Sequence, residues 1–120
     1  MSERASIAGY PVNLVVRDRR CVVVGAGRIA ARKIEALVGA GARVHVIAPE
    51  IGEEVRAWAD DGALTLSERA FEAADLDEAW LATTATGVPA VDRAVFEAGD
   101  ARRLWVNSAD DPANCSFTLM

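Results

Sequence analysis

The fold is decided by residues 20–37, Arg-Cys-Val-Val-Val-Gly-Ala-Gly-Arg-Ile-Ala-Ala-Arg-Lys-Ile-Glu-Ala-Leu. The valine-rich run at 21–24 is typical of a strand buried on both faces, and apolar residues at helical spacing follow the glycines. Gly25 permits a tight turn, Gly27 leaves room for a phosphate beside the backbone, and Ala30 lets the helix pack closely on the strand. We therefore expect a strand–turn–helix unit that binds a dinucleotide pyrophosphate at the helix N-terminus.

The residues after the turn agree with this interpretation. Residues 43–47 predict a second strand, which completes a βαβ unit. No lysine follows the turn at the P-loop position, so that class of phosphate site is excluded. A glycine-rich corner that binds nothing remains the alternative explanation.

Alternating strands and helices continue along the chain. Helices are predicted at 51–60 and 89–98, and strands at 64–66, 80–87 and 104–107. A short strand or hairpin is also expected at 14–16, before the charged turn at 17–20. This pattern predicts an α/β fold with a Rossmann-like, doubly wound, mostly parallel sheet, in a single domain over residues 1–120.

Composition narrows the classes of partner. With 120 residues and 52% hydrophobic content the chain can bury one core, and its net charge of −5 argues against nucleic acid. No signal peptide or membrane-spanning run is evident, so we expect a cytoplasmic protein. Two cysteines and one histidine, His45, form no metal-ligand pattern, so no metal site is predicted and His45 is interpreted as structural.

Ligands of doubly wound sheets bind beyond the carboxyl ends of the strands. The residues predicted to contact the cofactor lie at or just after such ends: Gly25, Ala26, Gly27, Arg28, Ile29, Pro49, Glu50, Thr83, Thr84, Ala85 and Asn107. The hydroxyls of Thr83, Thr84 and Thr86 are expected to bind a ribose or the nicotinamide amide, or else to be ordinary strand residues capping a loop.

The end of the second strand determines the expected cofactor. Ala48 stands where an acidic residue usually binds the ribose, and Glu50 follows two residues later. Glu50 is interpreted either as a ribose ligand or as the N-cap of the next helix. No arginine follows immediately to receive a 2′-phosphate, which favours NAD over NADP.

Several motifs, in order along the chain, resemble the N-terminal module of the siroheme synthase family, which combines precorrin-2 dehydrogenase with sirohydrochlorin ferrochelatase. They lie at 10–14, 17–33, 41–50, 81–86 and 106–117. The last of these, Val-Asn-Ser-Ala-Asp-Asp-Pro-Ala-Asn-Cys-Ser-Phe, is the most specific when joined to the glycine turn.

The resemblance implies NAD-dependent removal of a hydride and protons from precorrin-2 to give sirohydrochlorin, with Fe²⁺ insertion in bifunctional members. The family's catalytic aspartate matches Asp110, a candidate general base. From physics alone an ordinary turn is the favoured explanation of Asp-Asp-Pro, whereas the motif favours a catalytic role for Asp110 but not for Asp111. A non-catalytic, NAD-sensing regulatory Rossmann module is the alternative function.

The resemblance also implies partners. Family members have further segments that supply a dimer interface, so a homodimer is expected in the full-length form, and residues 116–120 are expected to pair as a strand with a second chain or with those segments. The many carboxylates of the tetrapyrrole require local cations. The candidate cations are Arg17, Arg19, Arg20, Arg102 and Arg103.

Overall fold

The structure, a computed structural model, describes residues 8–109 and 111–119. Its helices are α1 (Arg28–Gly39), α2 (Glu53–Asp60) and α3 (Pro89–Ala101), with short 3-10 turns η2 (Ala73–Leu76) and η3 (Pro112–Asn114). Its strands are β1 (Arg20–Val24), β2 (Arg43–Ile47), β3 (Thr65–Ser67), β4 (Leu81–Thr84) and β5 (Trp105–Ser108). From β1 onward the helices and strands follow the order predicted from the sequence, and their bounds are close to the predicted ones.

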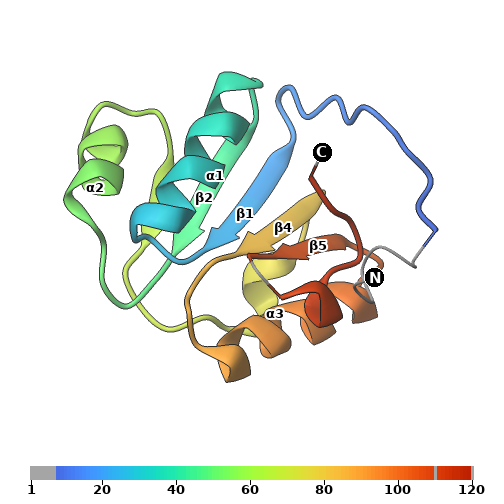
Figure 1. The fold of residues 1–120 in the computed structure, drawn as a ribbon. Helices are drawn as coiled ribbons and strands as arrows, with labels where there is room; N and C mark the ends of the chain where they lie inside the picture. Colours follow the sequence, from blue (N-terminus) through green and yellow to red (C-terminus); the bar gives the residue numbers. More distant parts are fainter. Residues whose placement is uncertain (1–7, 110, 120) are drawn as a thin grey trace.

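The strands form one parallel sheet in the order β3-β2-β1-β4-β5 (Figure 1). β1 is central, with β2 on one side and β4 on the other. This order changes direction between β1 and β4, which is the point where doubly wound sheets bind ligands. The predicted Rossmann-like fold is therefore confirmed.

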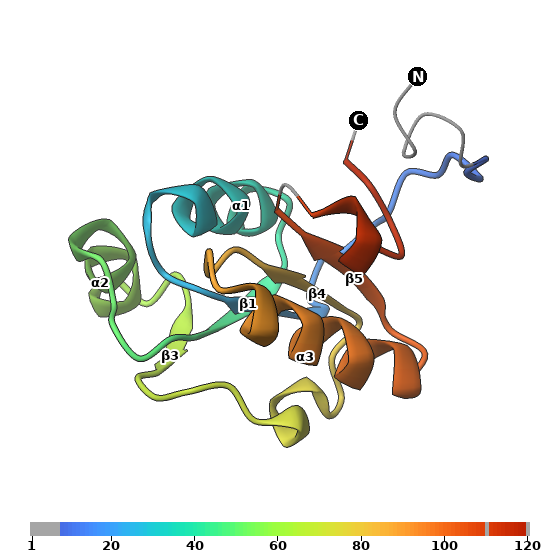
Figure 2. The ribbon, with the colours of Figure 1, turned by 60° about the horizontal axis from the view of Figure 1, so that its bottom comes forward.

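Helices cover both faces of the sheet, with α1 and α2 on one side and α3 on the other (Figure 2). Alternate residues of β1 enter different cores: Val23 packs with α1, whereas Val22 and Val24 pack with Val95 of α3. Each of these valines is 2% exposed or less, because a central parallel strand is covered on both faces.

The strand or hairpin expected at 14–16 is wrong. Residues 8–16 form neither helix nor strand, and a turn at 17–18 leads into β1, with the Asp18 amide donating to the Gly41 carbonyl at 2.9 Å. Because β2 and β4 already occupy both edges of β1, no edge remains for a hairpin partner.

Of the expected strand at 116–120, residues 116–119 form no strand in the described chain, and residue 120 lies outside the described residues. Residues 115–119 fold back against β5, where the amides of Ser116 and Phe117 donate to the Val106 carbonyl at 2.7 and 3.3 Å. The described part of the chain thus bonds this segment to its own sheet. No helix of the described residues is long and apolar enough to cross a membrane.

Candidate functional site

Gly25 turns the chain out of β1 in a conformation and a space that only glycine accommodates. Its φ is +118°, and a Cβ atom there would lie 2.6 Å from the carbonyl oxygen of Ala85. The Gly25 amide donates to the Ile47 carbonyl, and the Ala85 amide to the Val24 carbonyl, each at 2.9 Å. The turn is therefore bonded to the carboxyl end of β2 and to the loop after β4.

Gly27 is open where Gly25 is enclosed. It is exposed, it is the N-cap of α1, and no side chain caps the helix there. A Cβ atom at Gly27 would have no other atom within 4 Å. The first amides of α1 are thus presented to an approaching anion, with Arg28 and Ile29 exposed beside them and Ala26 buried beneath.

A hollow of about 180 Å³, here called the Gly27 hollow, adjoins this turn. It is lined by Ala26, Gly27, Arg28, Ala31, Gly52, Glu53, Glu54 and Val55. The Gly52 amide donates to the Ala26 carbonyl at 3.0 Å, which holds the start of α2 against the glycine turn. A Cβ atom at Gly52 would lie 2.6 Å from the same oxygen.

Carboxylates surround the outer side of this hollow. Glu50 and Pro49 are exposed after β2, and the N-cap of α2 is Gly52, so the N-cap interpretation of Glu50 is wrong. Glu53 and Glu54 form an acidic first turn of α2, and Glu54 accepts a 2.8 Å hydrogen bond from Arg32. Sequence analysis missed both glutamates, although their place at the start of a predicted helix beyond β2 was a usable signal.

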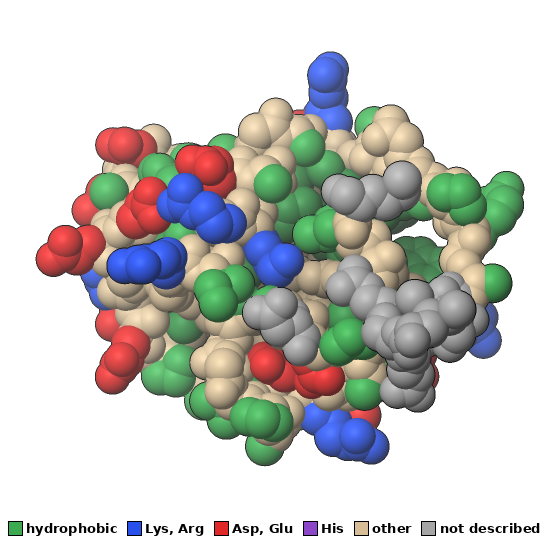
Figure 3. Space-filling model, viewed as in Figure 1, with side chains coloured by type: hydrophobic (Ala, Val, Ile, Leu, Met, Phe, Trp, Pro, Cys, Tyr) green, Lys and Arg blue, Asp and Glu red, His purple; other side chains and the backbone are tan. Residues whose placement is uncertain are grey.

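Basic and acidic side chains alternate over α1 and α2 and form no face of one sign (Figure 3). The Arg32 guanidinium lies 3.7 Å from Glu35 as well as 2.8 Å from Glu54. Exposed pairs of this kind contribute little to stability. Of the charged residues that line the hollow, Glu53 and Arg28 form no ion pair with another described residue.

The three threonines at the carboxyl end of β4, Thr83, Thr84 and Thr86, have different roles. The hydroxyl of Thr84 donates to Asp92 Oδ1 at 2.6 Å, and that of Thr86 lies 2.7 Å from the same oxygen. Asp92 is buried in the first turn of α3, and sequence analysis missed it because its partners lie six and eight residues away. Thr84 and Thr86 therefore shape the loop, and only Thr83 keeps a hydroxyl without a partner among the described residues.

A second hollow, of about 130 Å³, lies at the carboxyl end of β5 and is here called the β5 hollow. It is lined by Lys33, Asn107, Ser108, Ala109, Asp111, Pro112, Cys115 and Leu119. Asn107 is 6% exposed, and its Oδ1 atom has no partner among the described residues. Asn107 is therefore both buried and in contact with the hollow.

Asp110, the predicted catalytic residue, lies outside the described residues. Its neighbours are anchored: the Ala109 amide donates to the Thr84 carbonyl at 2.9 Å, and the Asp111 carboxylate accepts from Asn114 Nδ2 at 2.7 Å. Asp111 thus holds the 3-10 turn η3 through the side chain of Asn114.

The arginines considered for the tetrapyrrole carboxylates lie at the other end of the sheet. Arg20 is the first residue of β1, and Arg17 and Arg19 precede it. Arg102 and Arg103 lie between α3 and β5, where Arg102 bonds Asp77 at 3.0 Å. In a parallel sheet the amino ends of all strands lie opposite the carboxyl ends, so these arginines do not line the glycine turn.

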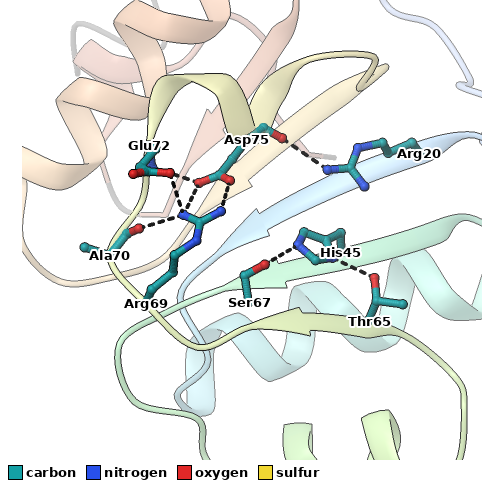
Figure 4. A network of polar contacts seen from close by, with 8 residues as sticks. All are labelled: Arg20, His45, Thr65, Ser67, Arg69, Ala70, Glu72 and Asp75. Atoms are coloured by element: carbon teal, nitrogen blue, oxygen red, sulfur yellow. Dashed lines mark hydrogen bonds and ion pairs between the residues drawn. The ribbon is translucent and has the colours of Figure 1, made fainter.

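His45 and Cys21 are structural. Both ring nitrogens of His45 lie within hydrogen-bond distance of hydroxyls, Nδ1 of Thr65 at 2.6 Å and Nε2 of Ser67 at 2.9 Å (Figure 4). Burial lowers the pKa of His45 and raises the pKa of the Cys21 thiol to about 11, so both stay uncharged at neutral pH. The described residues contain no group of three or more His, Cys, Asp or Glu side chains placed to hold a metal.

A second polar contact lies beside His45. Asp75 is buried and accepts hydrogen bonds from the Arg69 guanidinium and, at 2.8 Å, from the Glu72 amide (Figure 4). The Arg69 hydrogen bond lowers the pKa of Asp75. This network ties the segment after β3 together and lies away from the glycine turn.

Comparison with known proteins identifies the family. A family model described as "Putative NAD(P)-binding" matches residues 12–120. The siroheme synthases of Salmonella arizonae and Escherichia coli are 43% identical over 109 residues, which are 91% of this chain and 24% of each relative. The solved structure of SirC, a precorrin-2 dehydrogenase, superposes with a TM-score of 0.79 at 27% identity and covers 92% of this chain and 54% of that one. The chain thus spans about a quarter of the length of these siroheme synthases, and because the family model covers nearly all of it, the chain belongs to this NAD(P)-binding family.

Proposed function

We propose that this chain is the NAD-binding module of an enzyme that oxidises precorrin-2 to sirohydrochlorin. The observation that carries the proposal is the 43% identity with siroheme synthases over 91% of the chain. The likeness to SirC, a precorrin-2 dehydrogenase, supports the same reaction. The stretch that matches includes the glycine turn, whose open Gly27 suits a dinucleotide.

The cofactor is held in our proposal by backbone more than by side chains. The pyrophosphate lies over residues 25–29, where the amides of the turn and the N-terminus of α1 donate to it. The adenosine ribose lies toward Pro49 and Glu50, and the nicotinamide toward Thr83, Ala85 and Asn107. When bound, NAD supplies the acceptor for the hydride removed from the tetrapyrrole.

The charges near the Gly27 hollow support NAD over NADP. A 2′-phosphate would bring two further negative charges toward Glu50, Glu53 and Glu54, whereas ribose hydroxyls can donate to carboxylates. The first arginine after β2 is Arg56, and its guanidinium is already paired with Glu68 at 3.0 Å.

Asp110 is proposed as the general base that accepts the proton released as the hydride leaves. The role comes from the family motif, and the anchoring of Ala109 to Thr84 supports it, because the segment starts at the carboxyl ends of β4 and β5. Fe²⁺ insertion as a second activity, a homodimer in the longer protein, a single domain over 1–120 and a cytoplasmic location belong to the same proposal and rest on the resemblance.

The experiment is sirohydrochlorin formation from precorrin-2 and NAD, run on this chain and on a longer form that includes it. Asp110→Asn is expected to lower the rate about 10²–10⁴-fold, the usual contribution of a general base, with NAD affinity unchanged. Asp111→Asn is the matched control and should retain most of the rate, because an amide at position 111 can still bond Asn114.

Three results would contradict the proposal. Turnover of the Asp110 variant within a few-fold of the parent would remove its role as base. Greater damage from Asp111→Asn would transfer that role to its neighbour. NAD binding without turnover in either form would favour the regulatory, non-catalytic module.

A further inference from the structure

One lysine lies at the carboxyl end of the sheet, where the arginines considered for the tetrapyrrole carboxylates do not. Lys33 belongs to the second turn of α1, and its half-buried side chain lines the β5 hollow. The rest of that lining comes from β5 and the segment that follows it, which lies beside α1 in Figure 2. Among the described residues, Lys33 is thus the one cation of this hollow.

The Lys33 ammonium has no counter-ion among the described residues. Asp111 is the one acid of the described lining, but its carboxylate accepts from Asn114 Nδ2 at 2.7 Å and forms no ion pair with Lys33. The ion pairs of the described chain all involve arginines. A half-buried ammonium without a counter-ion has lost part of its hydration, so an anion that enters the hollow is favoured.

The other polar side chains of the lining already use their hydrogens. Asn107 Nδ2 donates to the Phe117 carbonyl at 3.2 Å and to the Cys115 sulfur at 3.8 Å. The Ser108 hydroxyl donates to a carbonyl of η3 at 2.8 Å. The Cys115 thiol lies 3.3 Å from the Ser108 carbonyl. Lys33 is therefore the side chain of this lining that still has hydrogens to donate.

The size of the β5 hollow limits what can enter it. Its volume of about 130 Å³ is slightly below the roughly 150 Å³ of a cavity that holds a benzene ring. A tetrapyrrole is far larger than that, whereas a short side arm that ends in a carboxylate is smaller than the ring. In the proposed function the nicotinamide lies toward the carboxyl ends of β4 and β5, and the hydride donor must lie beside it. The hollow thus adjoins the place of the substrate and has room for one of its arms.

We propose that the Lys33 ammonium binds one carboxylate arm of the tetrapyrrole in the β5 hollow. Lys33 then orients the substrate beside the cofactor and takes no part in proton or hydride transfer. The inference rests on the proposed function, and it names a substrate-binding cation at the carboxyl end of the sheet.

The test compares kinetics with precorrin-2 and NAD in whichever form of the protein is active. Lys33→Met removes the charge and keeps a long side chain that suits a helix. The KM for precorrin-2 should rise about 10-fold, the lower end for a hydrogen bond to a charged group, because Lys33 is half-buried. The values of kcat and of the KM for NAD should stay within about 2-fold of the parent. Lys33→Arg, which keeps a positive charge, should recover most of the loss.

A binding measurement gives a second readout that does not depend on turnover. Sirohydrochlorin and its fully esterified methyl ester, which has no carboxylate, are titrated by absorbance, and Lys33→Met should weaken only the acid. Lys33 is the only lysine of the sequence, so its ¹³C-methylated amine gives one side-chain signal, and methylation keeps the charge. That signal should shift with the acid and not with the ester.

Arg32→Gln is the matched control, because it removes the same charge from the adjacent residue of α1. Arg32 pairs with Glu54 at 2.8 Å and does not line the β5 hollow. Its effect on the KM for precorrin-2 should stay below about 2-fold, since a screened surface charge contributes little.

An unchanged KM for precorrin-2 in folded Lys33→Met would overturn the inference. So would an equal loss in Arg32→Gln, which would indicate general attraction of a polyanion, or an equal loss of acid and ester in Lys33→Met. A fall in kcat at constant KM would instead assign Lys33 to the proposed base Asp110. If the parent turns over no precorrin-2 in either form, the proposed function fails, and this inference fails with it.

Discussion

Substitutions of Gly25 and Gly27, the two glycines of the turn between β1 and α1, should have different effects: the first should lower stability and the second should weaken NAD binding. Gly25→Ala forces an L residue to a φ of +118°, at a cost of about 1–3 kcal/mol. Its Cβ would also lie 2.6 Å from the Ala85 carbonyl oxygen, and overpacking of this kind costs about 1–3 kcal/mol more. Together the free energy of unfolding should fall by about 2–6 kcal/mol, a large share of the roughly 5–15 kcal/mol of a typical domain.

Gly27 should tolerate a side chain as far as folding is concerned. Its φ is −91°, and a Cβ there would meet nothing within 4 Å. The change of N-cap residue in Gly27→Ala should cost less than about 1 kcal/mol. Gly27→Leu, in contrast, should place its side chain where the pyrophosphate lies. Losing an amide hydrogen bond to a charged group should raise the dissociation constant of NAD about 10- to 150-fold.

The assay pairs urea unfolding with NAD titration for the parent, Gly25→Ala, Gly27→Ala and Gly27→Leu. A Gly25→Ala protein as stable as the parent would refute the steric argument for the turn. Parent-like NAD affinity in a folded Gly27→Leu protein would show that the phosphate binds elsewhere.

Three further predictions concern the surroundings of the site. Asp92→Ala should lower the free energy of unfolding in urea by about 1–3 kcal/mol, because the Thr84 hydroxyl stays buried without its acceptor; no change would mean that the hydroxyl finds another partner. The free energy of unfolding should decline as the pH falls below 6.5, because burial lowers the pKa of His45 in the folded state and the unfolded state then binds more protons. A further decline is expected below pH 3.8, because the pKa of Asp75 is also lowered in the folded state. Urea unfolding from pH 3 to 8 checks both, and His45→Gln should remove only the first decline. Glu53→Gln should raise the affinity for NADP relative to NAD about 3-fold in titrations, since an exposed like-charge contact is worth up to about 1 kcal/mol; an unchanged ratio would exclude Glu53 from cofactor selection.

Local signals predicted the β1–turn–α1 unit because each residue there is constrained by its own backbone or by its immediate neighbours. The apolar run of β1 and the glycines of the turn required no knowledge of distant contacts. The hairpin at 14–16 failed for the opposite reason. Its valines satisfy strand propensity, but both edges of β1 are taken by strands that lie later in the chain.

In the candidate site, too, the features set by neighbouring residues could be predicted from the sequence, and those set by distant contacts could not. The openness of Gly27 could be predicted, because a fingerprint glycine has a known function. The different roles of Thr83 and Thr84 could not, because they depend on which side of β4 meets Asp92 of α3. The arginines could be placed at the amino ends of the strands, away from the glycine turn, only once every strand was known to be parallel to its neighbours.

The residues of the glycine turn are contiguous in sequence, but the residues that contact the turn come from later in the chain. The Ile47 carbonyl accepts a hydrogen bond from the Gly25 amide, the Gly52 amide donates to the Ala26 carbonyl, and Ala85 lies against Gly25. During synthesis the motif therefore leaves the ribosome long before its binding surface exists. A nascent chain of 60 residues carries the complete fingerprint without β4 and cannot have the Ala85 wall. In the proposed function the nicotinamide lies at the carboxyl end of β4, so a chain of that length lacks part of the cofactor site. Free NAD then stabilises the finished fold and not the partly made chain, because it binds only the former.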